Sequence, residues 1–461
     1  MAEKPRTEPA RGMRDFLPED VRRREHVIAI IKRVYERYGF EPLETPAVEN
    51  IETLLGKYGE EGNQLIFKIL KRGEHAATGE ADLALRYDLT VPLARVVAQY
   101  QSKLPRIFKR YQIQPVWRAD RPARGRFREF YQCDVDSLGS TSPVVEAELC
   151  AAVSDALVEL RFNDFVIRIN HRQSLTELLN SATIPPELHG DALIALDKLD
   201  KIGIDGVEKE FKQRGVSEVA SDWLLRSFSE KVTDKIKTAG AELSLAALGV
   251  AEEVVKSDTI GDSAGHSGRT NVRHILELCK HTSADQRVRW DPFLARGLSY
   301  YTGAIMEINV EGIGSLGGGG RYDNLVGMFL GQNVPACGFS LGLERILVVM
   351  TERNMFPPSL AMAPADVMIA TFDASGAGAA MRVAAMLRDA GLRVLVYPDA
   401  EKIGKQIKYA DSRGIPFVAL LGDDEIKAGT VTVKNLAAQT QSTYDQSAAG
   451  TAILEALKQR G

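Results

Sequence analysis

The sequence lacks the features of disulfide-stabilised, zinc-binding and membrane-spanning proteins. Its four cysteines, at positions 133, 150, 279 and 337, are far apart and form no C-x-x-C pair, so they indicate buried thiols and not a disulfide framework or a zinc site. No apolar run approaches the roughly 20 residues that a membrane helix needs, and the N-terminus is polar without an apolar segment behind it. We therefore expect a cytoplasmic protein with no membrane partner.

The chain also lacks a large excess of charge of either sign. It has 461 residues, a net charge of −4, 44% hydrophobic residues and 26% charged residues. These values are typical of a soluble globular protein of two or three domains. Any nucleic-acid partner must therefore be bound by local basic patches and not by a globally basic surface.

What the chain does have is a dense arginine cluster at residues 116–136. Pro122 and Gly125 exclude a helix in its middle, and the flanking segments 114–118 and 127–136 have the aromatic and β-branched content of strands. We expect an antiparallel pair of strands joined by a long cationic loop. The loop arginines are Arg118, Arg121, Arg124, Arg126 and Arg128.

The second strand of this pair carries polar side chains on one face. Strand alternation puts Phe130, Gln132, Asp134 and Asp136 on the same side. Arginine forks suit phosphate, and the carboxylates suit a cationic or N–H-bearing ligand. The alternative is a hairpin whose charges simply face water.

Upstream, apolar spacing predicts an amphipathic helix at 19–38, and the proline-interrupted segment 40–48 reads as a strand at a sheet edge or an interface. A strand at 83–90 is followed by a helix at 91–101. Asp88 between them is either a helix cap or a carboxylate at the mouth of a site.

Downstream, a helix at 144–160 and a buried strand at 165–170 precede a change of character. Residues 172–256 show helices without strand signals, closed by a Gly/Ser-rich linker at 257–268 and a helix at 271–280. Strands are expected at 289–301 and 304–310. The G-x-G-x-x-G match at 312–317 opens no helix directly, so we reject it as a dinucleotide site.

The last core segment is a strand at 335–341 running into a helix at 342–350. Arg345 lies in the first turn of that helix, where the helix dipole favours acidic and not basic side chains. A bound anion nearby would explain the arginine. The alternative is an ion pair with Glu344 or a remote carboxylate. After a proline-containing linker, alternating strands and helices predict a small α/β domain of about a hundred residues.

Several motifs together resemble those of class II aminoacyl-tRNA synthetases, and specifically the histidyl-tRNA synthetase family. The hairpin resembles motif 2, residues 40–48 motif 1 and residues 338–346 motif 3. L-A-R-G-L-S-Y-Y-T-G at 294–303 and G-G-G-R-Y-D at 318–323 resemble elements particular to the histidyl family. L-R-Y-D-L-T at 85–90, Q-C-D-V-D at 132–136 and K-Q-I-K-Y-A at 405–410 match as well.

The resemblance implies an α+β fold: a class II antiparallel-sheet catalytic core with a helical insertion, and a C-terminal α/β anticodon-binding domain. The implied divisions are 1–171 and 271–356 for the core, 172–270 for the insertion and 365–461 for the anticodon-binding domain. The implied activity joins L-histidine to ATP and transfers it to the 3′ end of tRNA(His). ATP is then a substrate, Mg²⁺ accompanies it, and the protein is a homodimer.

The resemblance also implies site roles. The catalytic arginines are Arg118, Arg296 and Arg345. ATP is bound by Arg118, Arg126, Phe130 and Arg345. Histidine is bound by Asp88, Leu89, Thr90, Gln132, Asp136, Tyr300 and Tyr301. Position 299 is Ser where the family usually has Asp. The missing carboxylate bears on how firmly the neighbouring Arg296 is oriented.

Two other functions compete with this interpretation. One is the histidyl-synthetase-like regulatory subunit of ATP phosphoribosyltransferase, which resembles the core but lacks the C-terminal domain and loses catalytic arginines. The other is an RNA-binding or stress-sensing pseudo-enzyme, which predicts broken ATP motifs. This chain keeps the three catalytic arginines and has a full domain at 365–461, so both are disfavoured.

Overall fold

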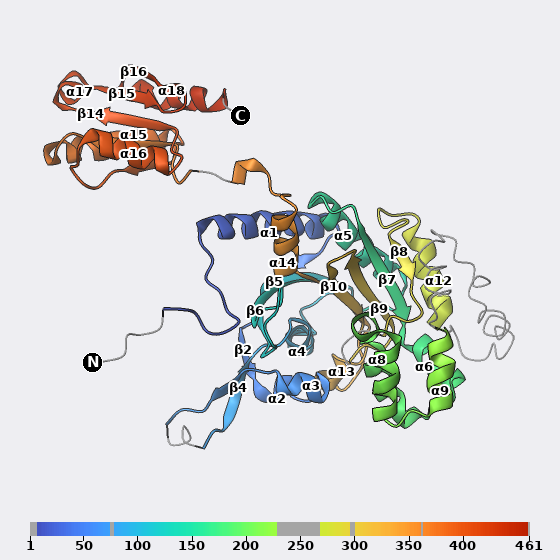
Figure 1. Cartoon of the computed structure of the whole chain (residues 1–461). Helices are drawn as coiled ribbons and strands as arrows, with labels where there is room; N and C mark the ends of the chain where they lie inside the picture. Colours follow the sequence, from blue (N-terminus) through green and yellow to red (C-terminus); the bar gives the residue numbers. More distant parts are fainter. Residues whose placement is uncertain (1–6, 74–77, 228–267, 296–299, 361–362, 460–461) are drawn as a thin grey trace. The chain divides into compact units, whose positions relative to one another are not determined.

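The protein folds into two compact units, Met1–Phe356 and Pro357–Gly461. The computed structural model describes residues 7–73, 78–227, 268–295, 300–360 and 363–459. The first unit is built on an eight-stranded sheet in the order β1-β5-β6-β11-β10-β9-β7-β8 (Figure 1). Its strands are β1 (Glu41–Pro42), β5 (Phe108–Trp117), β6 (Glu129–Leu138), β7 (Phe165–His171), β8 (Val288–Trp290), β9 (Ala304–Val310), β10 (Gly314–Arg321) and β11 (Ala336–Gly342).

The central strands of this sheet are antiparallel, and only the outer pairs β1/β5 and β7/β8 are parallel. The expected hairpin is confirmed: β5 and β6 pair from Phe108 opposite Leu138 to Trp117 opposite Glu129. The proline-interrupted segment forms only the two-residue β1, which lies at the sheet edge as predicted.

Helices cover one face of the large sheet (Figure 1). They are α1 (Pro18–Arg37), α5 (Val144–Glu159), α12 (Gly268–Cys279) and α14 (Leu343–Glu352). The apolar spacing of α1 buries Val27, Ile31 and Val34 against the sheet, and Cys133 and Val135 of β6 point into the same core. All four cysteines are buried and free, as expected.

The opposite face of the sheet carries a smaller set of elements. A three-stranded sheet, β2-β4-β3, joins β2 (Val48–Asn50), β4 (Ala81–Leu85) and β3 (Lys68–Leu70). Beside it are α2 (Ile51–Leu54), α3 (Gly59–Gln64), α4 (Thr90–Tyr100) and α13 (Gly327–Leu330). Four tyrosines enter the apolar cluster of this face: Tyr58, Tyr87, Tyr300 and Tyr322.

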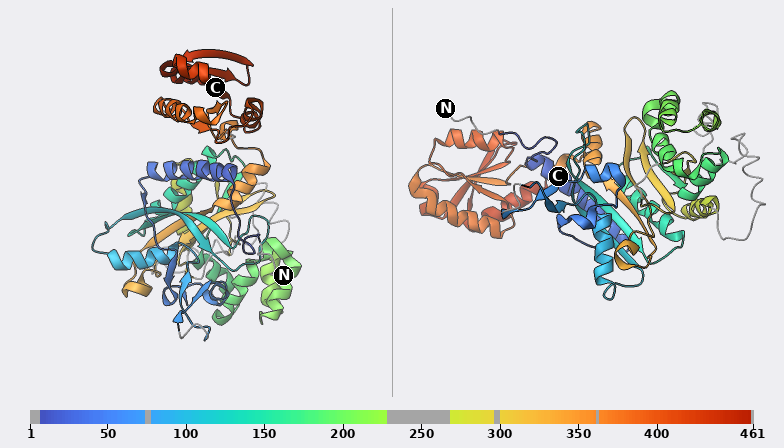
Figure 2. Two further views of the ribbon diagram at one scale, coloured as in Figure 1. Left: turned by 90° about the vertical axis from the view of Figure 1, so that its left-hand side faces the viewer. Right: turned by 90° about the horizontal axis from the view of Figure 1, so that it is seen from below.

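A group of helices follows β7 and lies at one end of the first unit (Figure 2, green). It comprises α6 (Arg172–Ser181), η2 (Pro186–Leu188), α7 (His189–Leu196), α8 (Leu199–Gln213) and α9 (Glu218–Ser227). These helices enclose an apolar cluster around Leu175, Leu224 and Phe211. Residues 228–267, which hold the rest of the expected insertion and most of its linker, lie outside the described residues; Gly268 begins α12 instead of ending the linker.

The prediction of a strand at 289–301 is wrong. β8 ends at Trp290, and Asp291 starts a turn in which its carboxylate accepts the Phe293 N–H at 2.9 Å. Pro292 has no N–H to offer a neighbouring strand, so the ladder stops there. The glycine-rich segment forms the strand β10, whose glycines allow close approach to the backbones of β9 and β11.

The second unit has a five-stranded sheet in the order β13-β12-β14-β15-β16. Its strands are β12 (Val367–Thr371), β13 (Val394–Val396), β14 (Phe417–Leu421), β15 (Thr430–Asn435) and β16 (Thr440–Asp445), and its helices are α15 (Ala377–Asp389), α16 (Ile403–Ser412), α17 (Asp423–Ala428) and α18 (Gln446–Lys458), with short turns η5 (Pro358–Leu360) and η6 (Ala374–Gly376). The alternating pattern is confirmed, but α17 and β16 were not predicted. α17 is six residues long, and β16 is an exposed strand without apolar alternation.

Candidate active site

The polar face of β6 forms the floor of the candidate site. Gln132, Asp134 and Asp136 point to the side of the sheet away from α1 and α5, and all three are buried. The residues in register on β11 are small: Gly342, Ser340 and Gly338. Small neighbours leave space above the floor, so the β6 side chains are not covered by their own sheet.

Asp136 is held by Arg110 of β5 and by Tyr322, which directly follows β10. The Tyr322 hydroxyl donates a short hydrogen bond to one carboxylate oxygen, and Arg110 Nη2 lies 2.8 Å from the other. Burial raises the pKa of Asp136, and the Arg110 charge opposes that rise. A Cβ atom on Gly338 would lie 1.9 Å from Asp136 Oδ1, so this carboxylate position requires glycine there.

Asp88 is a buried carboxylate with three donors. Oδ1 accepts the Tyr58 hydroxyl at 3.0 Å and the Val91 N–H at 3.0 Å, and Oδ2 accepts the Tyr300 hydroxyl at 3.1 Å. The bond to Val91 is a helix cap on α4, while the tyrosine bonds tie Asp88 to the polar cluster. Asp88 therefore bonds the first turn of α4, as the cap interpretation expects, and its role in a binding site stays a prediction. Burial raises its pKa, and these donors with the nearby Arg118 charge oppose the rise.

The tyrosine pair lies over the same face. The rings of Tyr300 and Tyr301 meet edge to face at 5.2 Å, and Tyr301 lies beside Gly320 of β10. Thr90 is in hydrogen-bond contact with the Tyr300 hydroxyl. Leu89 is fully buried, and its carbonyl oxygen accepts a hydrogen bond from Arg110 at 3.4 Å.

Arg118 directly follows β5, at the start of the arginine loop. Its Nε donates to the Tyr87 carbonyl oxygen at 3.0 Å, and its guanidinium lies 4.2 Å from the Tyr87 ring centroid and 5.3 Å from that of Phe130. The aromatic rings and the carbonyl fix this cation close to Asp88. Arg118 and Phe130 are thus neighbours, and their joint role in binding ATP stays a prediction.

The loop itself folds back on the motif 3 helix. Gly125 has φ +68°, and a Cβ there would lie 3.3 Å from Arg345 Cγ. Arg345 donates a short hydrogen bond to the Ser315 carbonyl oxygen. Arg126 pairs with Asp120 at 2.8 Å, and Arg124 pairs with Glu352. Arg124 and Arg126 are both more than half exposed, so they pair with carboxylates while still facing water.

Two residues of the predicted set cannot be placed. Arg296 and the unusual Ser299 fall in 296–299, outside the described residues. The other predicted residues gather in two groups. The first group, the polar cluster, consists of Asp88, Thr90, Gln132, Asp136, Tyr300 and Tyr301, with the buried Leu89 beside it. The second group lies at the arginine loop and consists of Arg118, Arg126, Phe130 and Arg345.

Sequence reasoning missed three residues that hold the cluster: Tyr58, Arg110 and Tyr322. Tyr322 lies inside the G-G-G-R-Y-D motif, which was a usable signal. Arg110 alternates with Gln112 and Gln114 on β5, so a polar stripe on that strand was a second signal. Nothing in the sequence around Tyr58 marks it.

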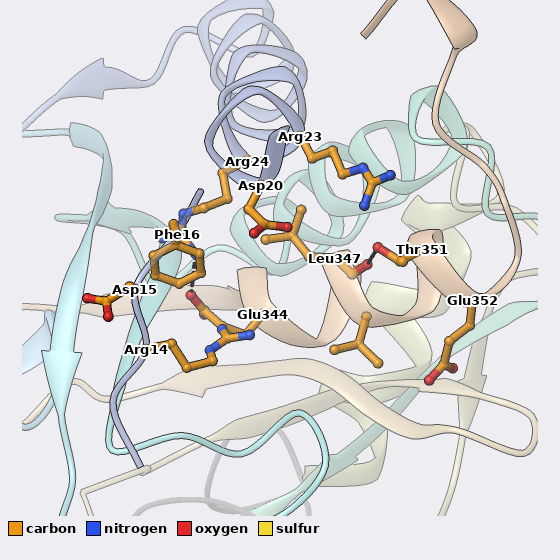
Figure 3. Close-up of a pocket in the computed structure, with 11 residues that line it drawn as sticks. Arg14, Asp15, Phe16, Asp20, Arg23, Arg24, Glu344, Leu347, Thr351 and Glu352 are labelled. Atoms are coloured by element: carbon orange, nitrogen blue, oxygen red, sulfur yellow. Dashed lines mark hydrogen bonds and ion pairs between the residues drawn. The ribbon is translucent and has the colours of Figure 1, made fainter. Parts of the chain in front are cut away.

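A separate hollow of about 370 Å³ lies between the N-terminal segment, α1 and α14 (Figure 3). Phe16, Arg24 and Glu344 are among its lining residues, and Arg24 and Glu344 form an ion pair there. None of the residues predicted to bind histidine or ATP lines it.

Within the described ranges, no three or more His, Cys, Asp or Glu side chains are grouped to hold a metal ion. In the same ranges, no helix is both long and apolar enough to cross a membrane.

Comparisons with known proteins agree with this geometry. The family described as "Histidyl-tRNA synthetase" matches residues 12–346, and the "Anticodon binding domain" family matches residues 366–456. The curated histidine–tRNA ligase of Flavobacterium johnsoniae is 40% identical over 484 residues, covering 96% of this chain and 98% of that protein. That of Christiangramia forsetii is 39% identical over 466 residues, covering 96% and 98%.

A solved structure is also similar over the full length. The crystal structure of histidyl-tRNA synthetase from Nostoc sp. PCC 7120 has a TM-score of 0.72 and 30% sequence identity, and covers 98% of this chain and 100% of that chain. With the antiparallel core, the anticodon-binding domain and these relatives, the chain belongs to the histidyl-tRNA synthetase family, the class II aminoacyl-tRNA synthetases that act as histidine–tRNA ligases.

Proposed function

We propose that the two groups of side chains have different roles in the histidine–tRNA ligase reaction: the polar cluster selects histidine, and the arginines act on ATP. Histidine and ATP form histidyl-adenylate and pyrophosphate; the histidyl group then passes to the 3′ end of tRNA(His). The observation that carries this division is the meeting of buried carboxylates on one sheet face with Arg118 beside Asp88. A carboxylate of histidine must reach a phosphate there, at the boundary of the two groups.

In the polar cluster, the α-ammonium group is held by Asp88, Thr90 and Gln132, and the imidazole by Asp136 and Tyr301. Tyr300 and Leu89 close the sides. An imidazole offers nitrogens on two sides, so selection needs a polar partner for each. An analogue without those nitrogens leaves buried polar groups unpaired, which costs binding energy.

In the arginine group, Arg118 contacts the α-phosphate, Arg345 the γ-phosphate and Arg126 the polyphosphate, while Phe130 stacks on the adenine. Arg296 supplies positive charge near the α-phosphate by resemblance to the family. Fixed guanidinium groups stabilise charge that develops on the phosphoryl group, with little covalent work by the protein. When bound, Mg²⁺ would be held mainly by the phosphate oxygens of ATP and would supply further positive charge there.

The rest of the chain serves tRNA and assembly. Residues 365–461 bind the anticodon, residues 172–270 form the helical insertion, and 1–171 with 271–356 form the catalytic core. The likeness of residues 40–48 to motif 1, together with the edge position of β1, supports a homodimer.

Histidine-dependent ATP–pyrophosphate exchange tests the division. We expect exchange with histidine and not with the other standard amino acids. Arg118→Ala and Arg345→Ala are expected to lower kcat/KM by about 100-fold or more, since each removes a fixed charge at a developing phosphoryl charge.

Arg353→Ala is the matched control. Arg353 follows the same helix as Arg345, but it bonds the exposed Asp164 at 2.9 Å and lies outside both groups. It should exchange at the rate of the parent protein. Equal exchange by all three variants would overturn the proposed arginine roles.

A further inference from the structure

The side-chain amide of Gln132 is fixed by two neighbours that the resemblance does not assign. Its Nε2 donates to Ser340 Oγ at 2.8 Å and lies 3.5 Å from Asp134 Oδ1. Ser340 is also in side-chain hydrogen-bond contact with Asp134. The three residues come from adjacent strands, with Asp134 and Ser340 directly opposite each other in register.

The direction of these bonds follows from hydrogen-bond chemistry. When Asp134 is ionised its carboxylate only accepts, so the Ser340 hydroxyl gives its one proton to Asp134. The Ser340 oxygen can then only accept, and it takes an N–H from Gln132. The amide must therefore turn its NH₂ end toward Asp134 and Ser340. Its carbonyl end is left pointing the other way.

That carbonyl end is without a partner. Gln132 is 9% exposed, and its Oε1 is buried and accepts no hydrogen bond from the described residues. A buried acceptor left unpaired is unfavourable, so a ligand that brings an N–H to it is favoured. A primary ammonium group, which only donates, is the ligand group that suits an orphan acceptor beside carboxylates.

We propose that Asp134 and Ser340 are positioning residues that lock the Gln132 amide, so that Oε1 is presented to the α-ammonium group of histidine. This inference rests on the proposed function, which places that ammonium at Gln132. Without these hydrogen bonds, the amide can rotate and present its NH₂ end to the α-ammonium group, which cannot accept a hydrogen bond. Discrimination for an amino acid over its deaminated analogue then falls.

The test compares histidine with imidazolepropionate, which keeps the ring and carboxylate but has no α-ammonium. In exchange assays, Asp134→Asn and Ser340→Ala should each raise the KM for histidine on the order of tenfold, the effect of one charge-assisted hydrogen bond. The change in kcat should be under about threefold, and the inhibition constant of imidazolepropionate should not change. Ser340→Thr keeps the hydroxyl and should retain the parent KM.

Two further variants separate the possible failures. Ser137→Ala removes a hydroxyl from the opposite face of β6 and should leave both constants unchanged. Gln132→Ala tests the proposed function itself. If it leaves the histidine KM unchanged, the ammonium is not at Gln132 and both ideas are wrong. If it raises that KM while Asp134→Asn and Ser340→Ala do not, only the positioning role is wrong. Equally weakened binding of histidine and imidazolepropionate in Asp134→Asn and Ser340→Ala would also overturn the positioning role, because it would indicate general damage to the site.

Discussion

Asp88 and Asp136 show how single residues keep a charged site inside the protein. Asp88 is held by hydroxyl and backbone donors, and Asp136 by one hydroxyl and the fully buried Arg110. Asp134 adds a third carboxylate; the cations near the three are Arg110, beside Asp134 and Asp136, and Arg118, beside Asp88. Burying a charge is costly unless it is paired. An excess of carboxylate in the free protein is therefore compatible with a cationic substrate and unfavourable without one.

This excess predicts a pH dependence of stability. Burial, with the neighbouring Asp136 and against the Arg110 charge, raises the pKa of Asp134 to about 7. In the unfolded chain an Asp pKa is about 3.9, so the folded protein binds the proton more tightly between these values. The free energy of unfolding should therefore fall as pH rises from about 4 to 7. Asp134→Asn should flatten this slope.

Urea unfolding, followed by tryptophan fluorescence, measures the free energy of unfolding of the first unit, which contains Asp134. All three tryptophans, at positions 117, 223 and 290, belong to the first unit. Histidine and ATP must be absent from the samples. Because Asp88 and Asp136 also have raised pKa values, part of the slope remains in the variant. An unchanged slope would show that Asp134 is ionised throughout this range.

At the scale of elements, α14 connects the loop, the sheet and α1. Glu344 in its first turn accepts Arg24 Nη1 at 2.8 Å and the Tyr131 N–H at 2.9 Å. The next residue, Arg345, lies against Gly125 of the arginine loop. The ion pair thus fixes the start of the helix that carries Arg345. The expectation that Glu344 is one alternative partner of Arg345 gives way to its bonds with Arg24 and Tyr131.

Removing this anchor should destabilise the first unit. Glu344→Ala leaves the Arg24 charge and the Tyr131 N–H unpaired, and breaking a buried ion pair costs about 3–5 kcal/mol. Glu352→Ala on the same helix breaks only the exposed pair with Arg124, which contributes about 0–1 kcal/mol. Urea unfolding by tryptophan fluorescence compares the two. Similar midpoints would mean that Glu344 is not the anchor.

At the scale of the whole molecule, the two units have separate cores. The second unit packs Val367, Leu387 and Phe417 among others in one cluster and Met368 and Val418 in another, on the two faces of its sheet. The candidate site draws on the first unit alone. Adenylate formation and anticodon binding are therefore expected to be separable.

A fragment ending at residue 356 tests this separation. We expect it to keep histidine-dependent pyrophosphate exchange within about tenfold of the full chain. By light scattering it should have the same oligomeric state as the full chain, because the motif 1 segment is retained. Charging of tRNA(His) should fall much further, since the anticodon-binding unit is gone. A loss of exchange in a folded fragment would show that the second unit supports the catalytic core.

The sequence by itself determined the elements with strong local patterns and the motifs of the site. The 3.6-residue spacing of α1, the loop enforced by Pro122 and Gly125, and the alternation of β6 are local properties, so they could be predicted. Tertiary structure alone decided which distant side chains hold the carboxylates. Tyr58, which directly precedes α3, reaches Asp88 from outside the eight-stranded sheet. Arg110 and Tyr322 meet Asp136 because β5 and β11 flank β6 in that sheet and β10, which ends just before Tyr322, pairs with β11. The need for glycine at 338 has the same origin, since the carboxylate that excludes a larger residue belongs to another strand.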